Sequence, residues 1–137
     1  MKVLVSACLL GKNCKYNGGN NFSREVADFL QGKEIVEVCP EVLAGFSIPR
    51  IPMEIVNGIL TDRDGNVLEE AMQTAIAKIL KDLPDVDCAV LKSRSPSCGV
   101  RQVYDGTFSG KLVDGQGKFA RALMDAGIKV YDSEELP

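Results

Sequence analysis

The clearest fold signal lies in residues 67–92, which read VLEEAMQTAIAKILKDLPDVDCAVLK. Between 67 and 82 the apolar residues recur at the i, i+3, i+4 and i+7 spacing that gives a helix one apolar face. Pro84 cannot continue a helix, so the helix ends before it. The apolar run at 87–92 then predicts a buried strand. A helix followed so closely by a buried strand indicates an α/β protein with a parallel sheet.

Strands and helices alternate along the rest of the chain. We expect strands at 2–8, 34–39 and 128–131, and helices at 24–31, capped by Ser23, and at 116–126. The segments 40–66 and 93–118 are rich in Pro, Gly or Ser, and we expect irregular connections there, with one short strand in the second. The predicted fold is a small three-layer, Rossmann-like α/β domain spanning 1–137, with a mostly parallel sheet and right-handed crossovers.

The composition disfavours several classes of partner. Of the 137 residues, 45% are hydrophobic and 26% are charged, which excludes a disordered or collagen-like chain. No run approaches the ~18 apolar residues of a membrane span, and the first ten residues make a poor signal peptide. We therefore expect a soluble cytoplasmic protein. The net charge of −3 and the scattered basic residues disfavour nucleic acid, so a small molecule is the expected partner.

Histidine is absent, and five cysteines carry most of the chemical information. Without histidine neither a Ser-His-Asp nor a Cys-His nucleophile is available, so general acid–base work falls to carboxylates, thiols, hydroxyls or lysine. The cysteine count is odd and too low for a secreted disulfide scaffold. In a reducing compartment the thiols are therefore free, catalytic or metal-bound.

Three of the cysteines follow separate predicted strands. Cys8 ends the first strand, Cys39 ends the second, and Cys98 lies in the loop after the third. Ligands of open parallel sheets bind beyond the carboxyl ends of the strands, so we expect these three thiols to meet at one edge. Cys14 is near enough in sequence to join them. Cys88 begins its strand, and we expect it to pack in the core at the opposite edge.

Converging thiolates suit two kinds of metal site. With Cys14, a four-thiolate zinc site is conceivable, although the chain has no C-x2-C pair. A [4Fe–4S] cluster tolerates long spacings between its cysteines. If only three cysteines bind the cluster, one iron stays open and can act as a Lewis acid toward a substrate.

Polar residues near the cysteines are candidates for the chemistry. Glu41, two residues after Cys39, is a candidate general acid or base; the alternative is an ordinary first-turn acid of a short helix. Ser95 and Ser97 flank Pro96 beside Cys98, where they serve either the site or a turn. Arg50 and Glu54 lie in the irregular connection, where they either contact substrate or pair with each other.

The chain resembles the small bacterial family once called domain of unknown function 523, which includes the thiouracil desulfurases. Six motifs carry this resemblance, and they span nearly the whole chain: Ser6-Ala7-Cys8-Leu9-Leu10-Gly11, Tyr16-Asn17-Gly18, Cys39-Pro40-Glu41, Pro49-Arg50-Ile51-Pro52-Met53-Glu54-Ile55, Lys92-Ser93-Arg94-Ser95-Pro96-Ser97-Cys98-Gly99 and Tyr104-Asp105-Gly106-Thr107-Phe108. The chain departs from the usual family pattern at three positions, where it has Lys15, Phe46 and Ile51.

The resemblance implies a [4Fe–4S] cluster bound by Cys8, Cys39 and Cys98. It places the catalytic acid or base on Glu41 and an assisting hydroxyl on Ser95, and it implies non-redox, hydrolytic removal of sulfur from a thiolated pyrimidine such as 2-thiouracil. We assign Arg50, Glu54 and Ser97 to substrate binding.

Two other functions compete with a desulfurase. One is a metal or sulfur carrier in which Cys14 completes a four-cysteine site, and the other is a thiol redox protein that cycles a disulfide. Cys14 discriminates among these readings, because its proximity to the other three thiols would favour a closed site.

Overall fold

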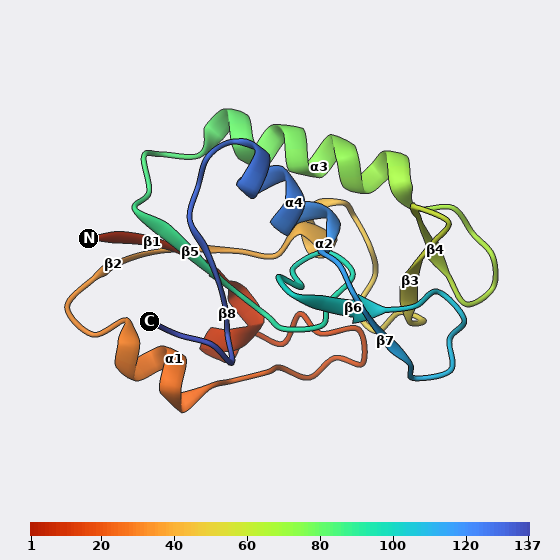
Figure 1. Ribbon diagram of the computed structural model, residues 1–137, viewed down its shortest axis with the longest axis horizontal. Helices are drawn as coiled ribbons and strands as arrows, with labels where there is room; N and C mark the ends of the chain where they lie inside the picture. Colours follow the sequence, from red (N-terminus) through yellow and green to blue (C-terminus); the bar gives the residue numbers. More distant parts are fainter.

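A computed structural model describes residues 1–137 and has a four-stranded parallel sheet at its centre (Figure 1). The strand order is β2-β1-β5-β8, and the strands span Glu34–Val38, Lys2–Ser6, Cys88–Leu91 and Val130–Asp132. All three pairings are parallel. The predicted α/β fold with a parallel sheet is therefore confirmed.

Helices cover both faces of the sheet. Figure 1 shows α3 (Glu69–Asp82) and α4 (Lys118–Asp125) on one side and α1 (Arg24–Phe29) on the other. Successive side chains of a strand point to opposite faces, so Leu4 packs beneath α3 and α4 while Val3 and Val5 pack against α1. The two clusters fill the core on either side of the sheet. None of the helices has the length and apolar character that crossing a bilayer requires.

The predicted helices agree closely with the observed ones. The apolar residues Met72, Ala75, Ile76 and Ile79 of α3 are buried, as their spacing predicted. The hydroxyl of Ser23 accepts a hydrogen bond from the backbone N–H of Val26 and caps α1, also as predicted.

The two segments predicted as irregular contain most of the structure that the sequence analysis missed. Residues 40–66 form a short helix, α2 (Pro40–Leu43), and a hairpin of β3 (Met53–Val56) and β4 (Ile59–Asp62). Asn57 and Gly58 form its turn with positive φ, so the Asn-Gly signal was present in the sequence. A second hairpin, β6 (Gln102–Tyr104) and β7 (Leu112–Asp114), replaces the expected single strand.

The first strand is shorter than predicted. β1 ends at Ser6, and residues Ala7–Leu10 turn into a 3-10 helix, η1, which carries Cys8. Cys8 therefore lies just beyond the strand. Cys88 is buried beneath α1 among Val3, Val5 and Val26, which agrees with the expected packing role.

Candidate functional site

The carboxyl ends of β2, β1 and β5 lie together and bring three cysteines to one cavity. Ser6 is in register with Val38, and Val5 is in register with Val90, so the three strands end at the same edge. Cys8 follows in η1, Cys39 precedes α2, and Cys98 lies in the loop after β5. All three line a cavity of about 560 Å³. The volume is in the ordinary range for small-molecule sites.

Burial favours the protonated form of the Cys98 and Cys8 thiols. Burial is the main cause that raises the pKa of Cys98 to about 12, and Glu41, Cys8 and Cys39 raise it further. Burial also raises the pKa of Cys8, against the lowering effects of an Asn21 hydrogen bond and the positive charge of Lys92. The thiols influence one another electrostatically, which places them in one group. A cationic metal centre would convert them to thiolates.

Cys14 joins the group from the side of Cys39. Its side chain is buried, and burial together with the neighbouring Cys39 and Cys8 raises the pKa of Cys14 to about 12. The proximity of Cys14 to Cys39, taken alone, is the observation that would favour a closed four-cysteine site. However, no three thiol or carboxyl groups converge closely enough to ligate a single metal ion.

This spacing fits a [4Fe–4S] cluster better than a zinc ion. In a cubane cluster each cysteine binds a different iron, so the ligands stand farther apart than around one ion. Cys8, Cys39 and Cys98 come from three separate segments that line the cavity, so each could bind a different iron of a cluster. The donor set contains thiols and no imidazole, because the chain has no histidine.

Glu41 is held rigidly at the cavity wall. Its Oε1 accepts hydrogen bonds from Nε and Nη2 of Arg50 at 3.2 and 2.6 Å, and its Oε2 accepts one from Oγ of Ser97 at 2.6 Å. The side chains of Arg50 and Glu41 are only 7% and 13% exposed. Arg50 also donates to the backbone carbonyls of Cys14 and Ser47, at 2.9 and 3.1 Å. The carboxylate is therefore fixed in position by charged and neutral donors.

Two serine hydroxyls connect Glu41 to the cysteine loop. Ser97 is 1% exposed, and its Oγ lies 3.0 Å from Oγ of Ser95. Oγ of Ser95 accepts hydrogen bonds from the backbone N–H groups of Ser97 and Cys98, at 3.2 and 3.0 Å. The two serines thus hold the turn and also line the cavity, so the turn role and the proposed site role are compatible.

Glu54 has a different partner from the one considered in the sequence analysis. Its Oε1 accepts hydrogen bonds from the backbone N–H groups of Gly106 and Phe108, at 2.9 and 3.2 Å. Arg50 pairs with Glu41 and forms no ion pair with Glu54. Glu54 therefore holds the loop between β6 and β7, whose Phe108 lines the cavity next to Tyr104 at the end of β6. Sequence reasoning gave neither aromatic residue a role.

The N-terminus of α4 supports the cysteine loop from behind. The backbone N–H groups of Lys118 and Phe119 donate to the carbonyls of Pro96 and Ser97, at 2.9 and 2.8 Å. Gly117 is essential to this approach, because a Cβ there would lie 2.5 Å from the carbonyl carbon of Ser97. The loop that carries Ser95, Ser97 and Cys98 is therefore held by a helix that begins about twenty residues later.

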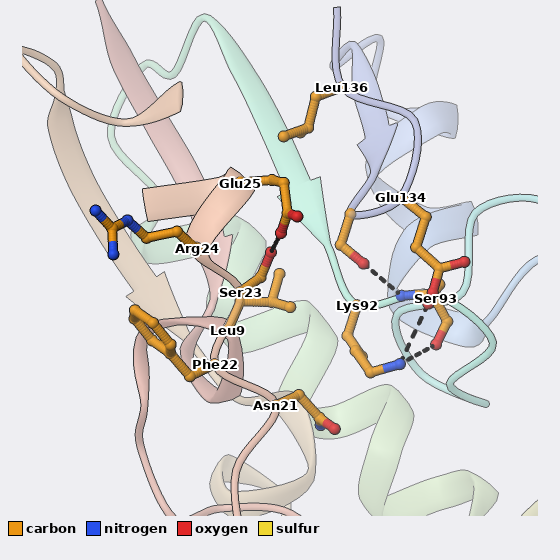
Figure 2. Close-up of a pocket in the computed structure, with 11 residues that line it drawn as sticks. Leu9, Asn21, Phe22, Ser23, Arg24, Glu25, Lys92, Ser93, Glu134 and Leu136 are labelled. Atoms are coloured by element: carbon orange, nitrogen blue, oxygen red, sulfur yellow. Dashed lines mark hydrogen bonds between the residues drawn. The ribbon is translucent and has the colours of Figure 1, made fainter. Parts of the chain in front are cut away.

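A second cavity of about 520 Å³ adjoins the first (Figure 2). It lies between the start of α1 and the C-terminal residues Ser133–Leu136, and it shares Asn21, Lys92 and Ser93 with the cysteine cavity. These three residues form the wall between the two cavities.

The fold and the cavity define an α/β protein that gathers thiols and a clamped carboxylate at the carboxyl edge of a parallel sheet. The model of the 2-thiouracil desulfurase family matches residues 3–135, and the chain belongs to this family. An uncharacterized protein of Bacillus subtilis (strain 168), YbbK, is 40% identical over 147 residues, covering 98% of this chain and 97% of that protein. A solved structure, the [4Fe-4S]-dependent thiouracil desulfidase TudS, is 33% identical with a TM-score of 0.85, covering 99% of this chain and 93% of that one.

Proposed function

We propose that this protein is a [4Fe–4S]-dependent desulfurase that removes sulfur from a thiolated pyrimidine such as 2-thiouracil. The observation that carries the proposal is the meeting of Cys8, Cys39 and Cys98 beside the clamped carboxylate of Glu41, in one cavity. Membership in the 2-thiouracil desulfurase family and the similarity to TudS support it. The carrier and redox alternatives have no comparable support.

In this proposal Cys8, Cys39 and Cys98 hold the cluster, and Cys14 is a neighbour of Cys39 that does not bind iron. When bound, the cluster supplies an open iron that acts as a Lewis acid on the sulfur of the substrate. The overall reaction replaces sulfur by the oxygen of water, so a thiouracil and water give uracil and hydrogen sulfide. No electron donor or acceptor is needed, because the carbon keeps its oxidation state.

Glu41 is the general base of this reaction. It takes a proton from the water that adds to the thiocarbonyl carbon, and Arg50 and Ser97 keep its oxygens aimed during the transfer. The hydroxyls of Ser97 and Ser95 extend from Glu41 toward the cysteine loop and offer a path by which the proton reaches the leaving sulfur. Arg50 thus acts on the reaction through Glu41 as a positioning residue.

The remaining polar and aromatic groups of the cavity bind the base. Tyr104 and Phe108 offer faces for stacking against a flat pyrimidine ring. Glu54 keeps Phe108 in place through the loop and has a second oxygen, Oε2, that is free of the loop's amides and can accept a ring N–H. The free thiols suit a reducing compartment, and we place the protein in the cytoplasm.

Anaerobic reconstitution with iron and sulfide tests the proposal. We expect four irons per chain in the wild type and in Cys14→Ala, and loss of iron in Cys8→Ala, Cys39→Ala and Cys98→Ala. Cys88→Ala is the matched control for Cys98→Ala, because both side chains are buried but Cys88 lies at the other end of β5, away from the cavity. Loss of iron in Cys14→Ala to the same extent as in the other three would contradict the three-ligand cluster.

Activity is measured on the loaded protein by the release of sulfide from 2-thiouracil. We expect Glu41→Gln to keep its iron and to lose at least about 100-fold in rate, because the base is removed while the shape is kept. Sulfide release by Glu41→Gln at the wild-type rate would refute the assigned role of Glu41.

A further inference from the structure

Lys92 occupies the wall between the two cavities. It is the first residue after β5, and its backbone N–H donates to Oγ of Ser6 at 3.0 Å, which anchors it at the carboxyl edge. Its Nζ donates to the carbonyl and to Oγ of Ser93, at 3.0 and 3.2 Å. Figure 2 shows the ammonium group turned toward Ser93 at the end of a half-buried side chain.

Lys92 has no carboxylate partner, although an acid is close. No carboxylate lies within 4.0 Å of its Nζ, since it takes part in none of the ion pairs of the structure. Glu134, an acid of the second cavity, has other partners: its Oε2 forms an ion pair with Nη2 of Arg94 at 2.8 Å and accepts a hydrogen bond from Oγ of Ser93 at 3.2 Å. A half-buried ammonium with neutral hydrogen-bond partners is electrostatically unsatisfied.

From this position the charge of Lys92 acts on the cysteines of the cavity, and on Cys8 in particular. The ammonium influences Cys8, and Cys8 in turn influences Lys92. The other cations that line the cysteine cavity differ from Lys92: Arg50 is paired with Glu41 and Arg94 with Glu134. Arg63 is exposed, and Lys15 lies over the ring of Tyr16, with its Nζ 5.9 Å from the ring centroid. Lys92 therefore has a positive charge beside the proposed cluster that no carboxylate neutralises.

We infer that Lys92 is the counter-charge of the cluster and stabilises the additional negative charge that arises when hydrosulfide forms in the cavity. The inference rests on the proposed function, because it needs the cluster to be bound at Cys8, Cys39 and Cys98. A cluster with three thiolates is net anionic, and an arriving hydrosulfide adds another negative charge. The ammonium of Lys92 offsets both negative charges. Lys92 and Glu41 share no hydrogen-bond partner, so the role of the counter-charge is separate from that of the base.

A unit charge changes the affinity of a nearby anion roughly tenfold when the effective dielectric constant is about 20 and the two are separated by about the length of a side chain and a cluster. Reduction of the cluster by one electron adds the same charge as hydrosulfide does. Removal of the ammonium should therefore weaken both events by a similar factor. A tenfold change in a one-electron equilibrium is about 59 mV.

The experiment compares reconstituted wild type, Lys92→Met, Lys92→Arg and Lys78→Met. Lys78 is an exposed lysine of α3, so its replacement removes the same charge away from the cavity. Three quantities are measured anaerobically: iron per chain, the midpoint potential of the cluster, and the affinity for sodium hydrosulfide from the change in the absorption spectrum. None of them requires turnover.

We expect Lys92→Met to bind hydrosulfide roughly tenfold more weakly and to have a potential lower by about 59 mV, with both values restored in Lys92→Arg and unchanged in Lys78→Met. Loss of iron in Lys92→Met but not in Lys92→Arg would support the same need for charge. Unchanged affinity and potential in a fully loaded Lys92→Met, or loss of iron in both Lys92 variants, would overturn the inference. An equal shift in Lys78→Met would also overturn it.

The failure of this inference is distinguishable from the failure of the proposed function. A wild type that releases sulfide from 2-thiouracil, with no effect of Lys92→Met on potential or hydrosulfide affinity, refutes the role of Lys92 alone. If Lys92→Met shows these effects but the cluster-loaded wild type releases no sulfide from thiolated pyrimidines, the desulfurase function alone is refuted.

Discussion

Replacement of Arg50 by methionine should strongly destabilise the cluster-free protein. Methionine fills similar space but removes the charge and the hydrogen bonds that Arg50 donates to Glu41 and to the carbonyls of Cys14 and Ser47. Because both side chains of the ion pair are almost fully buried, the carboxylate is left without its cation. Breaking a buried ion pair on one side costs about 3–5 kcal/mol of unfolding free energy.

A double-mutant cycle identifies the source of that cost. The cycle consists of wild type, Arg50→Met, Glu41→Gln and the double variant, with the free energy of unfolding measured by urea titration. In the double variant no unpaired charge is buried, so we expect it to be more stable than the sum of the single effects by at least about 1 kcal/mol. Arg24→Met serves as control, because it breaks an exposed helical pair worth only about 0.3–0.5 kcal/mol.

Additive effects of the two single substitutions would refute the reasoning. They would mean that Arg50 stabilises the protein through its contacts with the backbone carbonyls and not through Glu41. Arg50→Lys gives a further check: lysine keeps the charge but lacks the planar fork that contacts Glu41 with two nitrogens, so its stability should fall between those of the wild type and Arg50→Met.

Three further predictions concern the cysteine loop. Gly117→Ala should cost about 1–3 kcal/mol in thermal unfolding through its collision with Ser97, whereas Gly115→Ala, whose Cβ meets nothing nearer than 3.4 Å, should cost much less; equal costs would contradict the close approach. Glu134→Gln weakens the contacts of residue 134 with Arg94 and Ser93, so hydrogen exchange of residues 93–98 should quicken, and an unchanged rate would show that Glu134 does not restrain this loop. Because burial raises the pKa of Cys98 to about 12 in the folded state, the cluster-free protein should lose stability between about pH 9 and about pH 12, where only the unfolded state releases the proton, and Cys98→Ala should flatten this slope in urea titrations.

The central sheet, its helices and the edge at which the cysteines meet were predictable from the sequence. Periodicity is a local property, so the spacing of apolar residues in α3 and the short apolar run of β5 could be read without knowledge of their neighbours. The convergence of Cys8, Cys39 and Cys98 followed from a general rule of parallel sheets, because each cysteine comes shortly after a strand. The family motifs then indicated the chemistry.

The hairpins were less predictable. Strands β3 and β4 are only four residues long, and the prolines that precede them made 40–66 look irregular. The Asn57-Gly58 pair is the local sequence signal of this hairpin, because both residues of its turn have positive φ. Strands β6 and β7, with three residues each, are too short for alternation to be detected.

The partners of the polar side chains were decided by the tertiary structure alone. The sequence supplies the carboxylates and cations, yet Arg50 had two acids within reach along the chain, and only the packing of its segment against Cys14 directs it to Glu41. Lys92 and Glu134 lie far apart in sequence, and the return of the chain through β8 makes them neighbours of the same loop. A hydrogen bond acts over a few ångströms, so its partner depends on where the whole chain has folded, whereas the apolar pattern that builds each element depends only on adjacent residues.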